Sequence, residues 1–454
     1  MIIERVTQDK VYRFMDENEF AEGNVYTAII GKNGSGKSRL LNSVIQDLLN
    51  LRGYPSSFDR ELPFSRNKSF SGRLECRGIP RKIIAVSTSP FDKFPLPKRH
   101  EPIGNYSYLG LRDLLSNNLG LAYMSKIINS LITTILHDPS RAAVVGHVLQ
   151  YLGYSDEVWA RFQLSPTIGR IETFLRSDDP VGQFTKFLSS PSIRNVDRSF
   201  YFDDYGQIDE NKVHETFRIF DKIMAYTSKP RFDLVINKGG VHLLGGMYEI
   251  NEDFLFLIQS GIAKLRDVTL EKREFRQRVK ISDASSGEQS VVMAMLGIAS
   301  QIEDQTLICI DEPEVCLHPE WQEKYIDLLV TAFSNYIGCQ FIIATHSPQI
   351  VSNLPERNCN IMSMETGNFE RSTEYQHRSA DYQLAAIFKA PGHRNEYLNR
   401  IALNTFVKVG KNKFFDREDI DTFQLLNDSI DNIRANDPLY NLIIALKEMY
   451  NRYG

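Results

Sequence analysis

Residues 31–38 constrain the fold more than any other part of the chain. An apolar run, residues 25–30, precedes them, and residues 38–51 carry apolar side chains at helical spacing. A glycine-rich turn between a buried strand and a helix directs backbone N–H groups at an anion. The segment fits the pattern GxxxxGK[ST] in full and consists of Gly31, Lys32, Asn33, Gly34, Ser35, Gly36, Lys37 and Ser38. It therefore predicts a phosphate-binding loop in an α/β protein.

Two side chains of this loop have predicted roles with a bound nucleotide. We expect Lys37 to reach the β- and γ-phosphates, and the Ser38 hydroxyl to complete the coordination shell of Mg²⁺. The other loop residues are expected to bind phosphate through backbone N–H groups. ATP and Mg²⁺ are the cofactors that this pattern predicts.

A second apolar strand, residues 307–310, ends in two carboxylates, Asp311 and Glu312. In a parallel sheet, the carboxyl ends of the strands lie at one edge, where ligands bind. We expect Asp311 to act on Mg²⁺ through water and Glu312 to act as the general base that polarises the attacking water. Without the phosphate loop, the same pair would indicate only a solvated strand end.

Two more segments fit a nucleotide site. Ser285, Ser286 and Gly287 lead into a helix expected from Glu288, and a strand over residues 341–344 is followed by Thr345 and His346. A Ser-Ser-Gly helix start presents N–H groups and a hydroxyl to an anion. Taken alone, these serines would indicate an ordinary helix cap, and His346 a hydrogen-bonded residue at a strand end.

The order of these motifs resembles the ABC-type ATPases of the SMC/RecF/OLD branch, over about residues 1–50, 80–95 and 265–350. The resemblance implies an α/β P-loop head with a mixed sheet and flanking helices. It also implies that Ser285, Ser286, Gly287 and Gln289 bind the γ-phosphate of a nucleotide held by another subunit, and that His346 contacts the same phosphate. Each chain would then hold an incomplete site, so a homodimer or a higher even-numbered homo-oligomer is expected.

The chain departs from the family pattern at three places. One is the run Leu317, His318 and Pro319, which lacks the aspartate usual in the D-loop pattern of the family. The loop after the second strand, residues 87–92, has no glutamine where the family carries one to complete the Mg²⁺ shell. Glu288 stands where a second glycine is common, and it is expected to place extra negative charge near the γ-phosphate. Slow turnover is the expected consequence.

We divide the chain into four parts. Residues 1–95 and 231–353 are expected to form the two halves of the ATPase head, with a hairpin over residues 231–250. The helical pattern from residue 106 to 188 predicts an inserted helical lobe over residues 96–230. Residues 354–454 form a mostly helical extension, whose last helix starts at Asp437 and Pro438. The apolar face of that helix either packs on its own domain or docks a partner.

Charge is distributed unevenly along the chain. The net charge is −4, yet residues 52–99 contain eleven basic and four acidic residues. The basic ones are Arg52, Arg60, Arg66, Lys68, Arg73, Arg77, Arg81, Lys82, Lys93, Lys98 and Arg99. We expect this segment to form a basic face that binds nucleic acid or a partner, although a solvated loop is the alternative.

No membrane segment or secretory signal is expected. The longest apolar run, residues 291–299, is nine residues long, and the N-terminus reaches charged residues at once. The five cysteines show no CxxC spacing, so reduced thiols and a cytoplasmic location are predicted.

Three functions remain open at the level of sequence. The architecture resembles the ATPase subunits of two-component anti-phage systems such as Septu, with PARIS as a second choice, and this implies a sensor or scaffold that controls a separate nuclease. No nuclease centre is recognisable in the C-terminal part. The alternative is a RecF-like DNA-binding ATPase in repair. A third possibility is a weak or inactive ATPase whose only role is nucleotide-gated oligomerisation.

Overall fold

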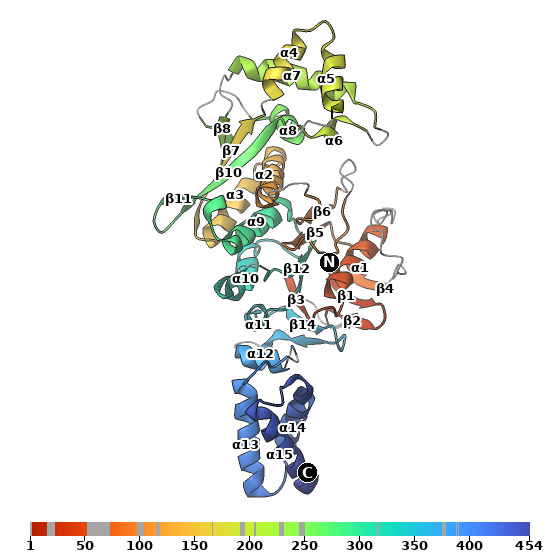
Figure 1. The fold of residues 1–454 in the computed structure, drawn as a ribbon, viewed down its shortest axis with the longest axis vertical. Coiled ribbons are helices and arrows are strands. Elements are labelled where there is room, and N and C mark those ends of the chain that lie inside the picture. The colour runs from red at the N-terminus through yellow and green to blue at the C-terminus, as the bar shows by residue number, and fades with distance from the viewer. Residues whose placement is uncertain are drawn as a thin grey trace.

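The computed structural model describes residues 2–15, 23–51, 73–97, 104–114, 119–165, 167–190, 196–203, 206–226, 231–244, 250–315, 317–374, 378–386, 388 and 390–454. Within these residues, a seven-stranded sheet of order β15-β14-β3-β13-β12-β5-β6 lies at the centre (Figure 1). Its strands run parallel except for β15 at one edge. They are β3 (Val25–Ile30), β5 (Lys82–Ser87), β6 (Tyr106–Leu109), β12 (Thr306–Asp311), β13 (Gln340–Ala344), β14 (Cys359–Ser363) and β15 (Phe369–Arg371).

The two faces of this sheet carry separate hydrophobic cores, because successive side chains of a strand point to opposite faces. One core contains Ile29 of β3 and Ile342 of β13, packed against α1 (Lys37–Leu51). A three-stranded sheet covers this side too, and it consists of β1 (Ile2–Thr7), β2 (Val11–Arg13) and β4 (Arg73–Arg77). The expected strand over residues 25–30 and helix over 38–51 are confirmed.

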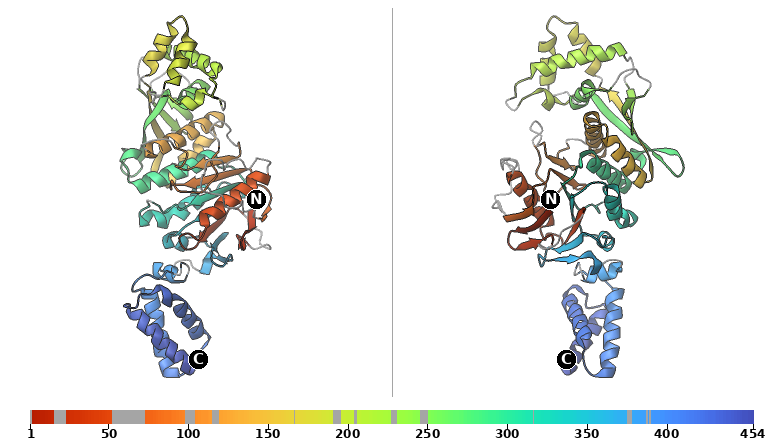
Figure 2. Two further views of the ribbon diagram at one scale, coloured as in Figure 1. Left: turned by 45° about the vertical axis from the view of Figure 1, so that its right-hand side comes forward. Right: turned by 180° about the vertical axis from the view of Figure 1, so that it is seen from behind.

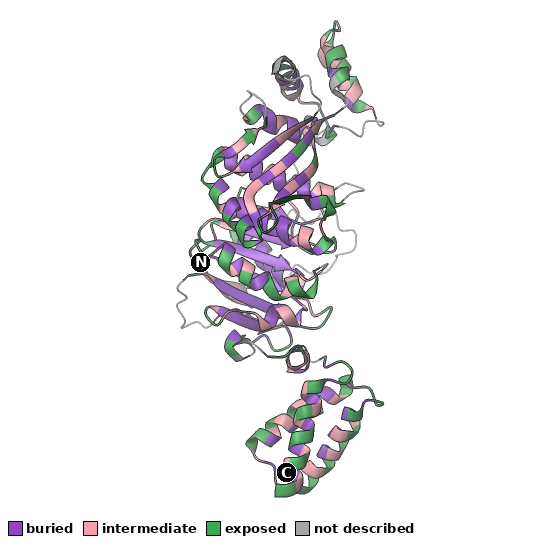
Figure 3. Cartoon of the chain, turned by 90° about the vertical axis from the view of Figure 1, so that its left-hand side faces the viewer, coloured by how far each residue is buried: buried purple, intermediate pink, exposed green. Residues whose placement is uncertain are grey.

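The other face contributes Ala28 and Ile343 to the larger core. Four helices contribute buried residues to this core beside the sheet: α2 (Leu119–His137), α3 (Arg141–Tyr151), α9 (Ser286–Gln301) and α10 (Pro319–Ala332). Figure 3 shows the strands at the centre of the molecule as mostly buried. Eleven of the sixteen residues of α9 are buried as well. Both faces of the sheet are thus covered, as the continuous apolar runs predict.

The prediction of helices throughout residues 106–188 is wrong at two segments. β6 joins the edge of the central sheet, and β7 (Tyr154–Leu164) is an eleven-residue strand. In β7 the buried residues Val158, Ala160 and Phe162 alternate with less buried ones, which is the period of a strand rather than of a helix. The remainder is helical, with α4 (Thr167–Leu175) and α5 (Pro180–Ser189).

β7 is the middle strand of a five-stranded antiparallel sheet of order β11-β10-β7-β8-β9. The other strands are β8 (Arg231–Asn237), β9 (Gly240–Leu243), β10 (Ala263–Lys272) and β11 (Gln277–Lys280). β8 and β9 form the hairpin predicted over residues 231–250. Helices α4 to α7 lie at the far end of this sheet (Figure 2), where α6 spans Arg198–Tyr201 and α7 spans Glu210–Tyr226. Helix α8 (Glu252–Gln259) precedes β10 in the chain.

One helix among the described residues, α2, is long and apolar enough to cross a membrane. Seven of its residues are buried within the larger core, and it packs along α9. In this structure, α2 is therefore a helix of the hydrophobic core.

The C-terminal part is helical, as predicted, and lies at the opposite end of the molecule from α4 and α5 (Figure 1). It follows α11 (Pro348–Ser352) and the β14–β15 hairpin, and consists of α12 (Ala380–Ala386), α13 (Glu396–Asn412), α14 (Arg417–Ser429) and α15 (Pro438–Tyr453). Leu439, Ile443 and Leu446 of α15 are buried against the neighbouring helices. The apolar face of the last helix thus packs on its own domain.

Candidate functional site

The register of the central sheet aligns four loops at one edge. Asp311 at the end of β12 pairs with Ser87 of β5 on one side and with Ala344 of β13 on the other, and Ala344 pairs with Ile29 of β3. Each of these strands continues directly into a segment that the sequence singles out. The sheet thereby gathers the phosphate loop, the carboxylate pair and the strand-end histidine.

The phosphate loop turns sharply between β3 and α1. Gly34 and Gly36 adopt φ angles of +78° and +100°, which residues with a side chain rarely adopt. At Gly31, a Cβ atom would lie 2.7 Å from the Ser35 hydroxyl and 2.9 Å from Met364 Cβ, so only glycine fits. The Ser35 hydroxyl is buried without a hydrogen-bond partner in the described part of the chain. These features fit a cradle for a bound anion.

Lys37 is buried at the start of α1, and its ammonium group donates to the Gly31 carbonyl at 3.1 Å. Its Nζ also lies 2.5 Å from Nε2 of His346. Burial lowers the pKa of His346 to about 4, and the Lys37 charge adds to this effect, so the imidazole is neutral at pH 7. Burial also lowers the pKa of Lys37, against the opposing effect of Glu312, Glu314 and Asp311. The two groups expected on one phosphate thus meet in the fold.

Asp311 is buried, and it accepts a hydrogen bond from the Ser38 hydroxyl at 3.0 Å. Burial raises the pKa of Asp311 to about 7, the Ser38 hydrogen bond opposes this shift, and Glu312 and Asp92 add to it. A buried carboxylate beside a hydroxyl is a set of oxygen donors that Mg²⁺ prefers. The two residues predicted for the metal therefore fit it.

Glu312 stands on a tight turn directly after β12. Its φ of +49° lies in the left-handed region, and its backbone N–H donates to the Ala344 carbonyl at 2.9 Å. Its Oε1 lies 3.9 Å from Nε2 of His346. Non-glycine residues in this region are held there by surrounding structure, often at functional sites. The turn places the carboxylate near His346, and the role of Glu312 as the general base stays a prediction.

Glu314 is a site residue whose role sequence reasoning missed. Its carboxylate accepts hydrogen bonds from the Thr345 hydroxyl at 2.9 Å and from the His346 backbone N–H at 2.5 Å. Burial raises the pKa of Glu314, against these hydrogen bonds. It joins the loop after β12 to the loop after β13. No pattern in the sequence indicates this contact, apart from the nearness of Glu314 to Asp311.

The loop after β5, which lacks the glutamine, is held by Asp92. This buried carboxylate accepts from the Tyr108 hydroxyl at 2.6 Å and the Phe94 N–H at 3.1 Å, and Arg112 lies 3.5 Å away. Tyr108 and Arg112 thus engage Asp92 within the loop. Ser87 is the residue of this segment that pairs with Asp311 in the sheet.

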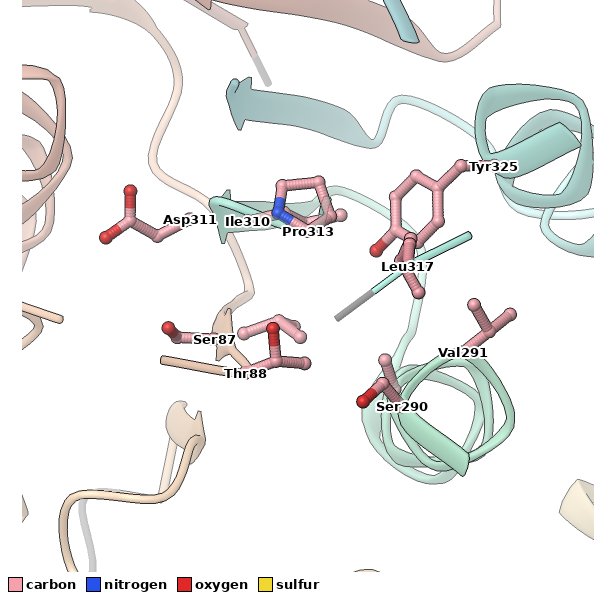
Figure 4. A pocket seen from close by; sticks show the side chains of 11 residues that line it. Ser87, Thr88, Ser290, Val291, Ile310, Asp311, Pro313, Leu317 and Tyr325 are labelled. Carbon is pink, nitrogen blue, oxygen red and sulfur yellow. The ribbon is translucent and has the colours of Figure 1, made fainter. Parts of the chain in front are cut away.

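A small pocket lies between the ends of β5 and β12 and helices α9 and α10. Figure 4 shows the Thr88 hydroxyl directed into it, whereas the Asp311 carboxylate points away. The Thr88 oxygen is buried and has no hydrogen-bond partner among the described residues. Ser290 and Val291 of α9 line the same pocket, so the signature helix packs beside the carboxylate strand.

The serine-glycine signature forms the N-terminus of α9. Ser285 is the helix cap and accepts from the Glu288 N–H at 3.2 Å, while Ser285 and Ser286 are exposed. Gln289 donates back to the Ala284 carbonyl at 2.8 Å. None of the hydrogen bonds or ion pairs of the described residues joins the signature to the phosphate loop. The exposed N-terminus, with buried Gly287 behind it, is open to a ligand from outside the chain.

The charge of Glu288 is compensated. Lys272 of β10 lies 3.2 Å from its carboxylate, and the Tyr154 hydroxyl donates to it. The extra negative charge expected near the γ-phosphate is therefore offset by an ion pair within the chain. Six of the eleven basic residues of the segment over residues 52–99 lie outside the described residues, namely Arg52, Arg60, Arg66, Lys68, Lys98 and Arg99.

Comparison with known proteins finds one matching protein family and several similar proteins. Residues 167–352 match the family described as "AAA domain, putative AbiEii toxin, Type IV TA system". This range contains α9, β12 and β13 but not the phosphate loop. The chain is 22% identical over 344 residues to "Protein ea59" of Escherichia phage lambda, covering 75% of this chain and 48% of that protein. It thus spans about half the length of that relative.

Two further relatives are named as ATPases. The "Retron Vc95 probable ATPase" of Vibrio cholerae serotype O1 biovar El Tor is 26% identical over 376 residues, covering 74% of this chain and 68% of that protein. The "Retron Ec83 probable ATPase" of Escherichia coli is 25% identical over 139 residues, covering 25% of each.

The solved structures that match the chain include an Smc head bound to the C-winged helix domain of ScpA, with a TM-score of 0.28, 14% identity and coverage of 82% of this chain and 96% of that chain. An ATP-binding cassette of an ABC transporter in its ADP conformation gives a TM-score of 0.27, 13% identity and coverage of 85% and 96%. The sheet order and the strand–loop–helix arrangement of residues 25–51 define an α/β P-loop domain. The family match to an AAA domain covers residues 167–352 of it.

Proposed function

We propose that this chain binds and hydrolyses ATP, dimerises around the nucleotide, and controls a separate nuclease in anti-phage defence, as a Septu-like ATPase subunit. The observation that carries the ATPase part is the sheet register that gathers Lys37, Ser38, Asp311, Glu312 and His346 at one edge. The names of the two retron relatives support it. The defence role rests on the resemblance in architecture, and a cytoplasmic location remains part of the proposal.

In the proposed reaction, Lys37 binds the phosphates of ATP and Glu312 accepts the proton of the attacking water. His346 is neutral, so it contacts the γ-phosphate by hydrogen bonding rather than by charge. Mg²⁺, when held by Ser38 and Asp311, would neutralise phosphate charge. The exposed signature at Ser285 and Ser286 would close on the γ-phosphate of a second subunit, so that ATP favours the closed dimer.

ATP turnover and mass in solution test this proposal together. We expect Lys37→Ala to lose ATP binding, and Glu312→Gln to bind ATP, lose turnover and accumulate as a dimer in light scattering. Glu320→Gln serves as the control because this carboxylate is exposed at the start of α10 and lies outside the site. If Glu312→Gln leaves both turnover and dimer lifetime unchanged, the general-base role is wrong.

The nuclease is proposed to dock on the C-terminal extension. The apolar face of α15 is buried in the bundle, whereas α13 leaves Leu403 and Val407 exposed one turn apart. Co-purification with the product of the adjacent gene on a size-exclusion column tests this part. We expect Leu403→Glu with Val407→Glu to separate the two proteins, and the absence of any complex with the unchanged chain would contradict the docking.

A further inference from the structure

The β10–β11 hairpin is a strongly charged feature that the ATPase site does not use. It projects from the five-stranded sheet on the side away from α1 (Figure 1). Residues 272–280 contain five basic side chains and one acidic side chain. The basic ones are Lys272, Arg273, Arg276, Arg278 and Lys280, and the acidic one is Glu274. Residues 273–278 are all exposed, so this charge faces solvent at the tip.

Three of these cations have carboxylate partners within the chain. Lys272 pairs with Glu288, Lys280 lies 3.3 Å from Asp267, and Arg278 lies 3.7 Å from Glu271. The Arg278 guanidinium also stacks over the Trp159 ring at 3.8 Å. By contrast, Arg273 and Arg276 at the tip have no side-chain partner among the described residues. Two guanidinium groups are thus available to an anion.

Phe275 lies between these two arginines, and 69% of its surface is exposed. The residues beside it, Glu274, Arg276 and Gln277, are charged or polar and exposed. A protein interface would need a desolvated apolar centre around such a ring. An isolated ring between two guanidinium groups instead matches the pattern of single-strand binding, in which an aromatic side chain stacks on a base beside contacts to phosphate.

We propose that the tip of the β10–β11 hairpin, residues 273–276, binds single-stranded nucleic acid. Arg273 and Arg276 bind phosphates of the backbone, because a guanidinium offers paired donors that match phosphate oxygens. Phe275 stacks on an accessible base. This assigns nucleic-acid binding to a site distinct from the segment over residues 52–99.

The position of the hairpin suggests what binding does. β11 leads through the short helix Ile281–Asp283 directly into the helix cap Ser285, and Lys272 of β10 pairs with Glu288 in the first turn of α9. A strand bound at the tip would therefore bias the position of the signature. This second step rests on the proposed function, whereas binding itself does not require ATP.

Fluorescence anisotropy tests the binding, with the full chain, no nucleotide, and a labelled mixed-sequence 20-mer at several salt concentrations. We expect Arg273→Ala with Arg276→Ala to weaken binding roughly tenfold and to make the slope of log K against log salt shallower by about 1.4, since each contact to a single strand contributes about 0.7. The control is Lys411→Ala with Arg417→Ala, which removes two exposed cations from the C-terminal bundle and should change little.

Phe275→Ala separates stacking from charge. We expect roughly tenfold weaker binding to the 20-mer and no change on an abasic strand of the same length, because stacking requires a base. Circular dichroism checks that each variant is folded, and Arg273→Lys with Arg276→Lys keeps the charge and should retain the salt slope.

The inference is overturned if the unchanged chain binds no strand at about 50 mM salt, if the arginine variant matches its control, or if Phe275→Ala weakens abasic and normal strands equally. Tighter binding of the 20-mer as a duplex would also contradict it. ATP turnover is measured separately: a chain that binds the strand through the tip but does not hydrolyse ATP disproves the proposed function and leaves this inference standing.

Discussion

At the residue scale, Glu314 determines where His346 lies. Its two carboxylate oxygens accept from the Thr345 hydroxyl and the His346 N–H, so both donors of this turn depend on one side chain. Thr345 is fully buried, and a buried donor without a partner costs about 1–3 kcal/mol. Glu314 is therefore a positioning residue for the phosphate-facing histidine.

Replacement of Glu314 should affect both stability and turnover. We expect Glu314→Ala to lower the free energy of unfolding by about 2–4 kcal/mol, because two donors lose their acceptor. ATP turnover should fall roughly tenfold as His346 shifts. Glu314→Gln keeps one acceptor but turns an NH₂ group toward the second donor, so it should have a smaller effect. Urea unfolding and phosphate release measure these changes, and an Ala variant as stable as Glu320→Ala would refute the role.

At the element scale, the start of α9 is held by the antiparallel sheet. Lys272 and Tyr154, from two adjacent strands, both engage Glu288. We expect Lys272→Met to loosen the first turn, and amide hydrogen exchange over residues 285–291 to accelerate roughly fivefold, which corresponds to an ion pair worth about 1 kcal/mol.

Lys324→Met is the matched control for this prediction, because Lys324 pairs with Glu320 on α10, away from the signature. Unchanged exchange at the start of α9 in the Lys272 variant would show that Tyr154 alone fixes the turn.

The last helix depends on its cap. Asp437 is buried and accepts from the Leu439 N–H at 3.0 Å and from the Arg394 N–H at 2.7 Å. Burial acts to raise the pKa of Asp437, but these hydrogen bonds and His393 hold the pKa below its ordinary value of 3.8. Since the folded state favours the ionised form, this contribution to stability is complete above about pH 4 and is lost as the pH falls through the folded pKa.

We therefore expect Asp437→Ala to destabilise the bundle by about 1–2 kcal/mol at pH 7 and to reduce its sensitivity to acid. Thermal melts followed by circular dichroism between pH 7 and pH 3 measure both effects. Asp431→Ala, at an exposed carboxylate near the same helix, should leave the melts unchanged. A parallel loss of stability at every pH would exclude the linkage.

Much of this architecture could be predicted from local pattern. The apolar runs of β3, β12 and β13 identified buried parallel strands, and the phosphate loop fixed the strand and helix around it. β7 was missed because its inward residues alternate within a stretch whose composition favours helices. β11 was missed because its residues are mainly charged and are held by pairing with β10.

In the candidate site, too, some features could be predicted from the sequence and others could not. Five site residues could be predicted from the sequence because each belongs to a short motif: Lys37, Ser38, Asp311, Glu312 and His346. The contacts among these residues could not be predicted, because residues about 270 to 310 positions apart meet only through strand order and register. The roles of Glu314, Tyr154 and Lys272 depend on such contacts, so no pattern in the sequence identified them.

At the scale of the whole molecule, the described residues form three separate hydrophobic clusters. Two lie on the faces of the central sheet, and the third lies within the C-terminal helices. The third contains Ala385 of α12 together with buried residues of α13, α14 and α15, and none from the head. The links to the rest include the packing of α12 on α11 and Phe388, which follows α12 and is buried in the larger core of the head. A cluster that is complete in itself predicts a unit that folds alone.

Separation of the two parts tests this prediction. We expect a fragment of residues 378–454 to be helical and monomeric and to melt cooperatively, because it keeps the whole third cluster and the caps at Asn395, Asp416 and Asp437. The chain 1–377 should still bind ATP, because every residue of the candidate site lies before position 347. Circular dichroism and nucleotide titration measure these outcomes, with Lys37→Ala in the shorter chain as the control for binding. An unfolded 378–454 fragment would show that contacts with α11 hold the bundle together, and the head and the bundle would then respond to nucleotide as one body rather than as two linked parts.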